Sequence, residues 1–154
     1  MRVLDTRPPF AGLANLSEAA LASLPTPCYL LDEAQLRRNG EILLGVQQRT
    51  GCKMLLAQKA FSNFDLYPLL APCLAGTEAS GLYESRLGKE ELPEKENHVF
   101  CAAYRVDEFN ELLDYADHIV FNSPGQLAQF GPAAKAAGKS VGLRVNPECS
   151  TQEG

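Results

Sequence analysis

A chain of 154 residues, 45% hydrophobic and 21% charged, can bury one ordinary hydrophobic core and is too apolar to be disordered. Its formal net charge of −5 argues against a nucleic acid or an anionic membrane as partner, because either would favour a basic surface. No apolar run has the length of a membrane span or a signal peptide, so we expect a cytoplasmic protein.

Short apolar runs alternate along the chain with helical patterns, after an N-terminal extension of residues 1–25 with a short helix. The expected strands are residues 28–31, 53–58, 76–80, 98–103, 118–121 and 141–145. Their spacing fits one strand plus one helix per repeat. The strand at 76–80 has the weakest pattern, because "GTEAS" is small and polar.

Helices are expected between these strands. Asp32 suits the N-cap of a helix that ends near Gly51. The apolar face of this helix should comprise Leu36, Ile42, Leu43 and Val46. Residues 64–74 contain two prolines and predict a short or kinked helix. A further helix opens at residue 106 or 107, and Ser123 followed by Pro124 marks the start of another.

Strands alternating with helices predict an α/β fold with parallel pairing, as a doubly wound sheet or a (β/α)-barrel. No G-x-G turn is present to bind a dinucleotide. The stretch "AAKAAGKS" at 133–140 loosely fits a phosphate-binding loop, but it ends a helix instead of opening one, with Gly138 as the cap. We expect the charged residues 89–97 to form a solvated loop.

The cysteines and histidines have no spacing typical of a disulfide framework or a metal site. Five cysteines are widely separated and form no C-x-x-C pair, which favours reduced thiols. His98 and His118 adjoin hydrophobic segments and have no ligand-like neighbours in the sequence. We therefore expect no metal ion and expect both histidines to be buried or to lie at a sheet edge.

Lys59 ends the apolar run "MLLAQK" and has two interpretations. Functional groups of parallel α/β proteins collect at the carboxyl ends of strands, and Lys59 follows such a strand. A partly desolvated amine loses its proton more readily and can attack an aldehyde to form a Schiff base. The alternative is a lysine that only marks the exit of the strand into water.

Several segments occur in the order seen in a known enzyme family: "TPCYLLDEAQLRRNGEILLGVQQRTGCKMLLAQKAF", "TEASGLYESRLG", "CAAYRVDEFNELL", "HIVFNSPGQL" and "VGLRVNPE". Together they resemble the N-terminal part of carboxynorspermidine/carboxyspermidine decarboxylases. These enzymes belong to the alanine-racemase-like, fold-type III group that depends on pyridoxal 5′-phosphate (PLP). The resemblance covers nearly everything from Thr26 to Glu148 and implies that residues 26–154 begin a PLP-binding (β/α)8 TIM-type barrel.

The resemblance implies that Lys59 holds PLP covalently at the end of the first barrel strand. From its place on the last strand, Arg144 is a candidate to bring a guanidinium near the cofactor or a carboxylate, and the alternative is an ion pair inside the barrel mouth. Glu78, on the strand after Lys59, is a candidate cofactor-site residue that could hold a polyammonium group or Lys59 in place. The expected reaction is the decarboxylation of a carboxylated polyamine to norspermidine or spermidine, by a family that forms homodimers. Residues 28–31 would pair with a β domain that follows the barrel.

The chain is shorter than such an enzyme, because an eight-stranded barrel takes about 250 residues. We therefore expect a partial barrel without its C-terminal half and without the β domain. Two alternatives remain open at this point. Besides the first part of a polyamine decarboxylase, the chain could be a catalytically inactive fragment that acts only as a pairing module, or a fold-type III decarboxylase or racemase for another amino acid.

Overall fold

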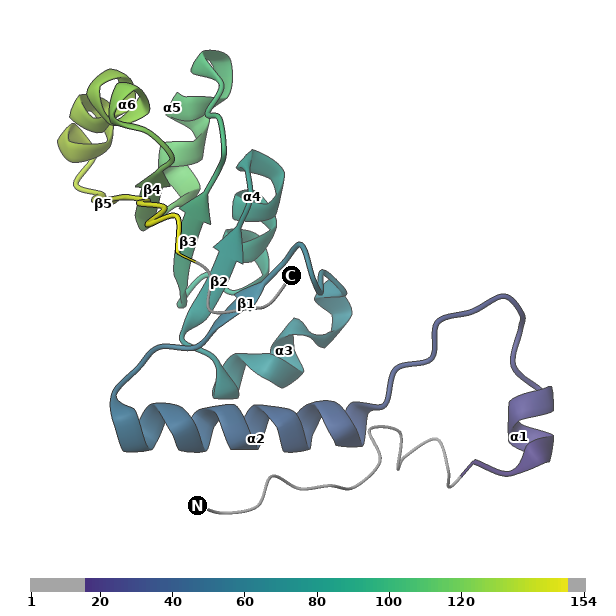
Figure 1. The fold of residues 1–154 in the computed structure, drawn as a ribbon. Coiled ribbons are helices and arrows are strands. Elements are labelled where there is room, and N and C mark those ends of the chain that lie inside the picture. Colours follow the sequence, from purple (N-terminus) through teal and green to yellow (C-terminus); the bar gives the residue numbers. More distant parts are fainter. Residues whose placement is uncertain (1–15, 150–154) are drawn as a thin grey trace.

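The computed structural model describes residues 16–149, and five parallel strands form its centre (Figure 1). The strands are β1 (Leu55–Ala57), β2 (Gly76–Ala79), β3 (Glu96–Phe100), β4 (His118–Phe121) and β5 (Ser140–Leu143). They lie side by side in the order β1-β2-β3-β4-β5. A doubly wound sheet reverses its strand order at a switch point, and this sheet does not. The α/β prediction is confirmed, and the order is that of a barrel wall.

Helices connect the strands and cover one side of the sheet (Figure 1). The α-helices are α1 (Glu18–Ala22), α2 (Glu33–Thr50), α3 (Tyr67–Leu70), α4 (Leu82–Glu91), α5 (Val106–Tyr115) and α6 (Pro124–Ala136). Two short 3-10 helices, η2 (Phe64–Leu66) and η3 (Ala71–Cys73), flank α3, as the prolines of this segment predict. No helix in residues 16–149 is long and apolar enough to cross a membrane.

The predicted helix ends are confirmed by their caps. Asp32 Oδ1 accepts a hydrogen bond of 2.9 Å from the Gln35 amide, and Ser123 Oγ accepts one of 3.2 Å from Gln126. Each bond satisfies an amide that has no partner within its helix. Gly51 ends α2 with a φ of 72°, a left-handed conformation that glycine adopts without strain.

The hydrophobic core lies between the sheet and helices α4, α5 and α6. Its buried members are Ala79, Leu82, Val99, Phe109, Leu112, Ala116, Ile119, Phe121, Phe130 and Ala134. Aromatic rings fill the centre, with the centroids of Phe109 and Phe130 at 4.5 Å and Tyr104 edge-on to Phe109 at 5.5 Å. Such pairs stabilise a core beyond the area that they bury.

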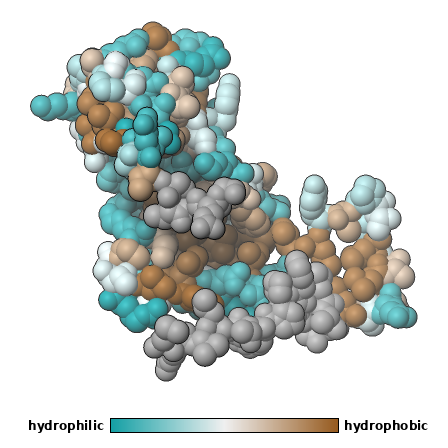
Figure 2. All heavy atoms as spheres, viewed as in Figure 1, coloured by the Kyte–Doolittle hydropathy of each residue, from teal (hydrophilic) through white to brown (hydrophobic). Residues whose placement is uncertain are grey.

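Helix α2 packs away from this core, and its predicted apolar face is partly wrong. It contacts α3 and η3, where Gln47 accepts from the Met54 amide at 2.8 Å and donates to the Cys73 carbonyl at 2.8 Å. Ile42 is 60% exposed, because the short helices beneath α2 cover only a narrow stripe of it. Hydrophobic residues also gather on the surface around α1 and the segment that leads into α2 (Figure 2).

Two other expectations are wrong. Residues 28–31 form no strand here, and Tyr29 is fully exposed; the pairing of this segment with a later β domain stays a prediction. Residues 89–97 are not one solvated loop: they include the end of α4, a short turn and the start of β3, where Asn97 is buried. The predicted division at residue 25 stays a prediction, and residues 1–15 and 150–154 lie outside the described part.

Candidate active site at the open face of the sheet

The two faces of the sheet differ in what covers them. Val99 and Ile119 point into the helix-covered core and are fully buried, whereas their strand neighbours His98 and His118 are only half-buried. Side chains alternate between faces along a strand, so the half-buried set shares the other face. We call this second side the open face; in a closed barrel it would form the interior.

Lys59 lies two residues after the end of β1, at the carboxyl edge of the sheet. The Gln58 amide donates to the Glu78 carbonyl at 3.1 Å, which extends the pairing of β1 with β2 by one residue. The Gln58 side chain is buried on the helix side, where it donates to the Glu84 carbonyl at 2.8 Å and accepts from the Tyr67 hydroxyl at 3.2 Å. Lys59 comes next, within the turn that leaves the carboxyl edge of the sheet.

The environment of Lys59 differs from one expectation. The residue is exposed, whereas a desolvated amine was one of its two predicted states. The cause is its place in the sheet: β1 is an edge strand with β2 as its one neighbour, and the chain turns after it through a 3.0 Å bond from the Ala60 amide to the Ala57 carbonyl. Within residues 16–149, Lys59 is therefore an accessible amine at the carboxyl edge.

Arg144 occupies the same edge at the opposite end of the sheet, directly after β5. Its backbone amide donates to the Phe121 carbonyl at 2.9 Å, so pairing with β4 continues to this residue. Its guanidinium donates to Asn122 Oδ1 at 3.1 Å and lies 5.5 Å from the centre of the Phe100 ring. The contacts of the Arg144 guanidinium are therefore the Asn122 side-chain amide and the face of the Phe100 ring.

Glu78 sits in β2 and pairs with Ala57 on one side and His98 on the other. It is half-buried between buried Thr77 and Ala79, which places it on the open face. The structure thus brings Glu78 to the strand beside Lys59. Arg144 lies on the same face as Glu78, with β3 and β4 between them.

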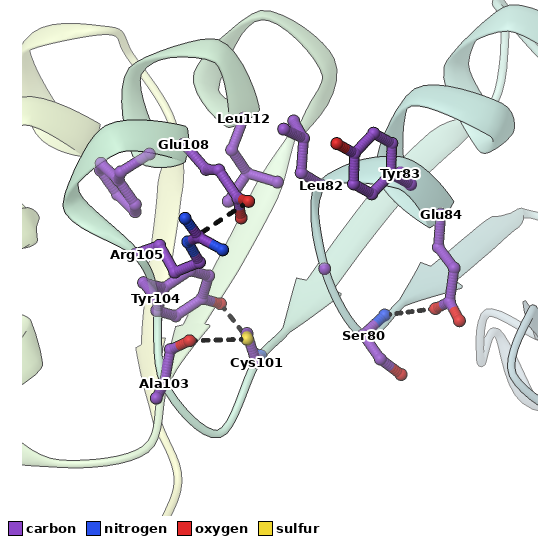
Figure 3. Close-up of a pocket in the computed structure, with 12 residues that line it drawn as sticks. Ser80, Leu82, Tyr83, Glu84, Cys101, Ala103, Tyr104, Arg105, Glu108 and Leu112 are labelled. Carbon is purple, nitrogen blue, oxygen red and sulfur yellow. Dashed lines mark hydrogen bonds and ion pairs between the residues drawn. The ribbon is translucent and has the colours of Figure 1, made fainter.

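A pocket of about 380 Å³ opens at the same edge, between the β2–α4 and β3–α5 connections (Figure 3). The polar groups in it bond to one another: the Ser80 amide donates to Glu84 at 2.5 Å, and Arg105 Nε lies 3.4 Å from Glu108. The Tyr104 hydroxyl donates to the Val120 carbonyl at 2.8 Å, and burial raises its pKa. Because these polar groups already have partners, the pocket offers a ligand mainly apolar contacts.

The open face also carries a pair of histidines beside a glutamate, a group that the sequence analysis missed. His98 and His118 are paired across β3 and β4, and their rings stack with centroids 4.1 Å apart. Nε2 of His98 lies 3.0 Å from Oε2 of Glu96, and Nε2 of His118 lies 3.8 Å from the same oxygen. The three residues could together hold a metal ion, so the statement that the histidines lack ligand-like neighbours is wrong. Glu96 lies two residues before His98 along the same strand and was overlooked, and strand pairing brings His118 beside them.

Glu96 is the charged centre of this group. Lys53 donates to its Oε1 and His98 bonds to its Oε2, and these two contacts lower the pKa of the Glu96 carboxyl to about 2.

Comparison with known proteins connects this geometry to a family. The chain is 41% identical over 135 residues to a carboxyaminopropylagmatine decarboxylase of Synechocystis. It is 39% and 36% identical to carboxynorspermidine/carboxyspermidine decarboxylases of Campylobacter jejuni and Herminiimonas arsenicoxydans. The crystal structure of the Campylobacter jejuni carboxynorspermidine decarboxylase, complexed with norspermidine, superimposes with a TM-score of 0.78 over 82% of this chain. The chain is homologous to part of a carboxynorspermidine/carboxyspermidine decarboxylase.

The match to these decarboxylases is partial in length. The chain spans 35%, 32% and 34% of the three curated relatives, and 34% of the solved decarboxylase chain. A D-threonine aldolase structure from Filomicrobium marinum, 15% identical with a TM-score of 0.69 over 87% of this chain, shares the fold. No protein-family model matches the chain. The predicted resemblance to the decarboxylases and the partial barrel are confirmed.

Among the residues that build this site, sequence reasoning missed Gln58 and Asn122. Gln58 anchors the turn that carries Lys59, and Asn122 binds the guanidinium of Arg144. Gln58 ends an apolar run and therefore looks like a residue that reaches water. The signal that could have found it is the alternation of β1, which puts position 58 on the same side as buried core residues.

Proposed function

We propose that Lys59 is the lysine that carries PLP in a decarboxylase of carboxylated polyamines, and that this chain supplies the first strands of its barrel. The observation that supports this most is the 36–41% identity to three such decarboxylases across more than four-fifths of the chain, together with a TM-score of 0.78 to one of them. The place of Lys59 at the carboxyl edge of a barrel wall agrees with it.

The residues present fit PLP at this edge. The cofactor needs a primary amine for its aldehyde, and Lys59 offers an exposed one on a turn that Gln58 anchors. PLP is also an anion, and Arg144 presents a guanidinium at the same carboxyl edge of the sheet. When bound, PLP supplies an electron sink for the carbanion that remains after carbon dioxide is lost.

The chain's own residues then have separate tasks. Gln58 fixes the turn, which sets the direction of the Lys59 side chain. Asn122 and Phe100 hold Arg144, whose guanidinium suits a carboxylate or phosphate oxygen. Glu78 places a half-buried carboxylate beside the strand of Lys59, where it can attract an ammonium group of a polyamine.

Borohydride trapping tests the role of Lys59. The chain is mixed with PLP below one equivalent, reduced, digested and mapped by mass spectrometry. We expect the pyridoxyl group on Lys59 and its loss in Lys59→Ala. The matched control is Lys53→Ala, which removes a lysine from the same segment, one that is paired with Glu96, and should leave the label on Lys59. A label spread evenly over the other lysines would refute the proposal and favour a pairing module without catalytic function.

The substrate class is proposed from the relatives, whose names include carboxyaminopropylagmatine as well as carboxynorspermidine and carboxyspermidine. All three are carboxylated and strongly cationic, which suits an acidic protein with Glu78 on its open face. A panel of these compounds, with ornithine and diaminopimelate as controls, should give decarboxylation of the polyamine derivatives only. Turnover of the control amino acids instead would favour another fold-type III activity.

A further inference from the structure

The group formed by Glu96, His98 and His118 lies apart from Lys59 in the sheet. Lys59 is the second residue after the end of β1. His98 pairs with Glu78 and with His118, and Glu78 itself pairs with Ala57, the last residue of β1. The histidines are therefore level with a residue two positions before Lys59, or about 7 Å lower along the strands. Glu96 is two residues lower again. A ligand held here would occupy a different level of the open face.

These three residues have the ligand types and spacing of a transition-metal site. Zinc bonds of 2.0–2.2 Å in a tetrahedron set neighbouring ligand atoms about 3.3 Å apart. The Nε2 atoms of His98 and His118 lie 3.0 and 3.8 Å from Oε2 of Glu96, on either side of that value. All three ligand atoms lie within 4.8 Å of one another.

The position of the group favours a role beyond packing. Branched apolar side chains usually fill the interior rows of a parallel barrel. Here one row of the open face contains Glu78, His98, His118 and Ser140, with Glu96 in the row below. Polar groups in such a row cost desolvation energy unless they have partners. The side chains of Glu96, His98 and His118 remain 25–33% exposed, so an ion can reach them.

We propose that Glu96, His98 and His118 bind a divalent transition metal of the zinc class. Two imidazole nitrogens and one carboxylate oxygen are the protein ligands, and a coordination position remains for water on the open face. Two histidines and one carboxylate are a ligand set that both zinc and non-haem iron use. Lys53 bonds the other oxygen of Glu96, and its positive charge repels the metal ion and lowers the affinity of the site.

Zinc binding to the reduced full chain, measured by equilibrium dialysis, tests this proposal. We expect one equivalent to bind, and binding to weaken by roughly 100-fold or more in His98→Ala and in His118→Ala, because each loses a ligand. Lys53→Gln should tighten it by roughly two- to fivefold, since it removes an exposed like charge. The matched control is Cys101→Ser, which removes a thiol that the site does not use. Unchanged zinc binding in the double histidine variant would refute the proposal.

Nuclear magnetic resonance of the imidazole rings gives a second readout that needs no variant. The chain contains only two histidines, so each ring nitrogen can be followed without overlap. One equivalent of zinc should shift the Nε2 signals of both residues together. If zinc leaves both unchanged, the metal is bound elsewhere and the proposal is wrong. Neither experiment involves PLP, so failure of this site and failure of the Lys59 proposal are distinguishable.

Discussion

Asn97→Ala should destabilise the fold more than any surface substitution, because this buried amide joins two strands and two helices. Asn97 is 1% exposed and lies in β3. Its Nδ2 donates to the carbonyl of Ser85 at 2.6 Å, to the hydroxyl of Ser85 at 3.1 Å and to the carbonyl of Tyr115 at 3.2 Å. Its Oδ1 accepts from the Thr77 hydroxyl at 3.3 Å.

The magnitude follows from these contacts. A typical hydrogen bond contributes about 0.5–1.5 kcal/mol net, and a buried polar group left without a partner costs about 1–3 kcal/mol. Alanine removes the whole amide and leaves the Ser85 and Thr77 hydroxyls without it as a partner. We expect a loss of about 3–4 kcal/mol. This is a large part of the ~5–15 kcal/mol that stabilises a domain.

Urea denaturation followed by far-ultraviolet circular dichroism measures the free energy of unfolding. Asn110→Ala is the matched control, because Asn110 is an exposed residue in the middle of α5. It should change stability by less than about 0.5 kcal/mol. A loss below about 1 kcal/mol for Asn97→Ala would show that water or neighbouring groups replace the amide, and would refute the reasoning.

Three further predictions concern backbone approach, alkaline pH and capping. In Gly76→Ala the new Cβ would lie 1.9 Å from the Glu96 carbonyl oxygen, so this variant should unfold at much lower urea than Gly81→Ala, whose Cβ meets nothing within 4 Å. Burial raises the pKa of Tyr104, so the folded state keeps a proton that the unfolded chain releases above pH about 10. The stability from this group is complete below that pH and is lost progressively above it, and Tyr104→Phe should flatten the decline in denaturation series at pH 9 to 11. Ser123→Ala should cost about 1 kcal/mol, measured by thermal unfolding, since it removes the N-cap of α6; Ser123→Asp should restore most of it.

The parts of the fold that were predicted correctly carry their signal in a few adjacent residues. Asp32, Ser123 and Gly51 define helix ends through contacts within one turn, and "HIVF" coincides with β4. Even the weak stretch "GTEAS" is a strand, because its small residues allow close approach: a Cβ on Gly76 would clash with β3. The repeat of strand and helix was enough to predict parallel pairing.

The parts that were missed depend on register between strands. Glu96 and Asn97 close a run of charged residues, which predicts a loop, yet one binds Lys53 and both histidines and the other is buried. The pairing of His98 with His118 joins residues 20 positions apart. Sequence alone does not predict the pairing of the two histidines, because that requires knowing which residues of β3 and β4 lie opposite each other.

Lys59 and the group of Glu96, His98 and His118 differ in their position in the sheet, and this should affect how each binds a ligand. Lys59 is exposed because β1 is an edge strand with β2 as its one neighbour within residues 16–149. Glu96, His98 and His118 lie on central strands, where paired neighbours hold them together without further chain. Metal binding should therefore be measurable with the chain as it is. The rate at which Lys59 reacts with PLP should rise when a further element covers the free edge of β1. If Lys59 reacts with PLP no faster than the exposed lysines of this chain, the Lys59 proposal is wrong. A preference for Lys59 that rises when the edge of β1 is covered would show that its edge position limits the reaction.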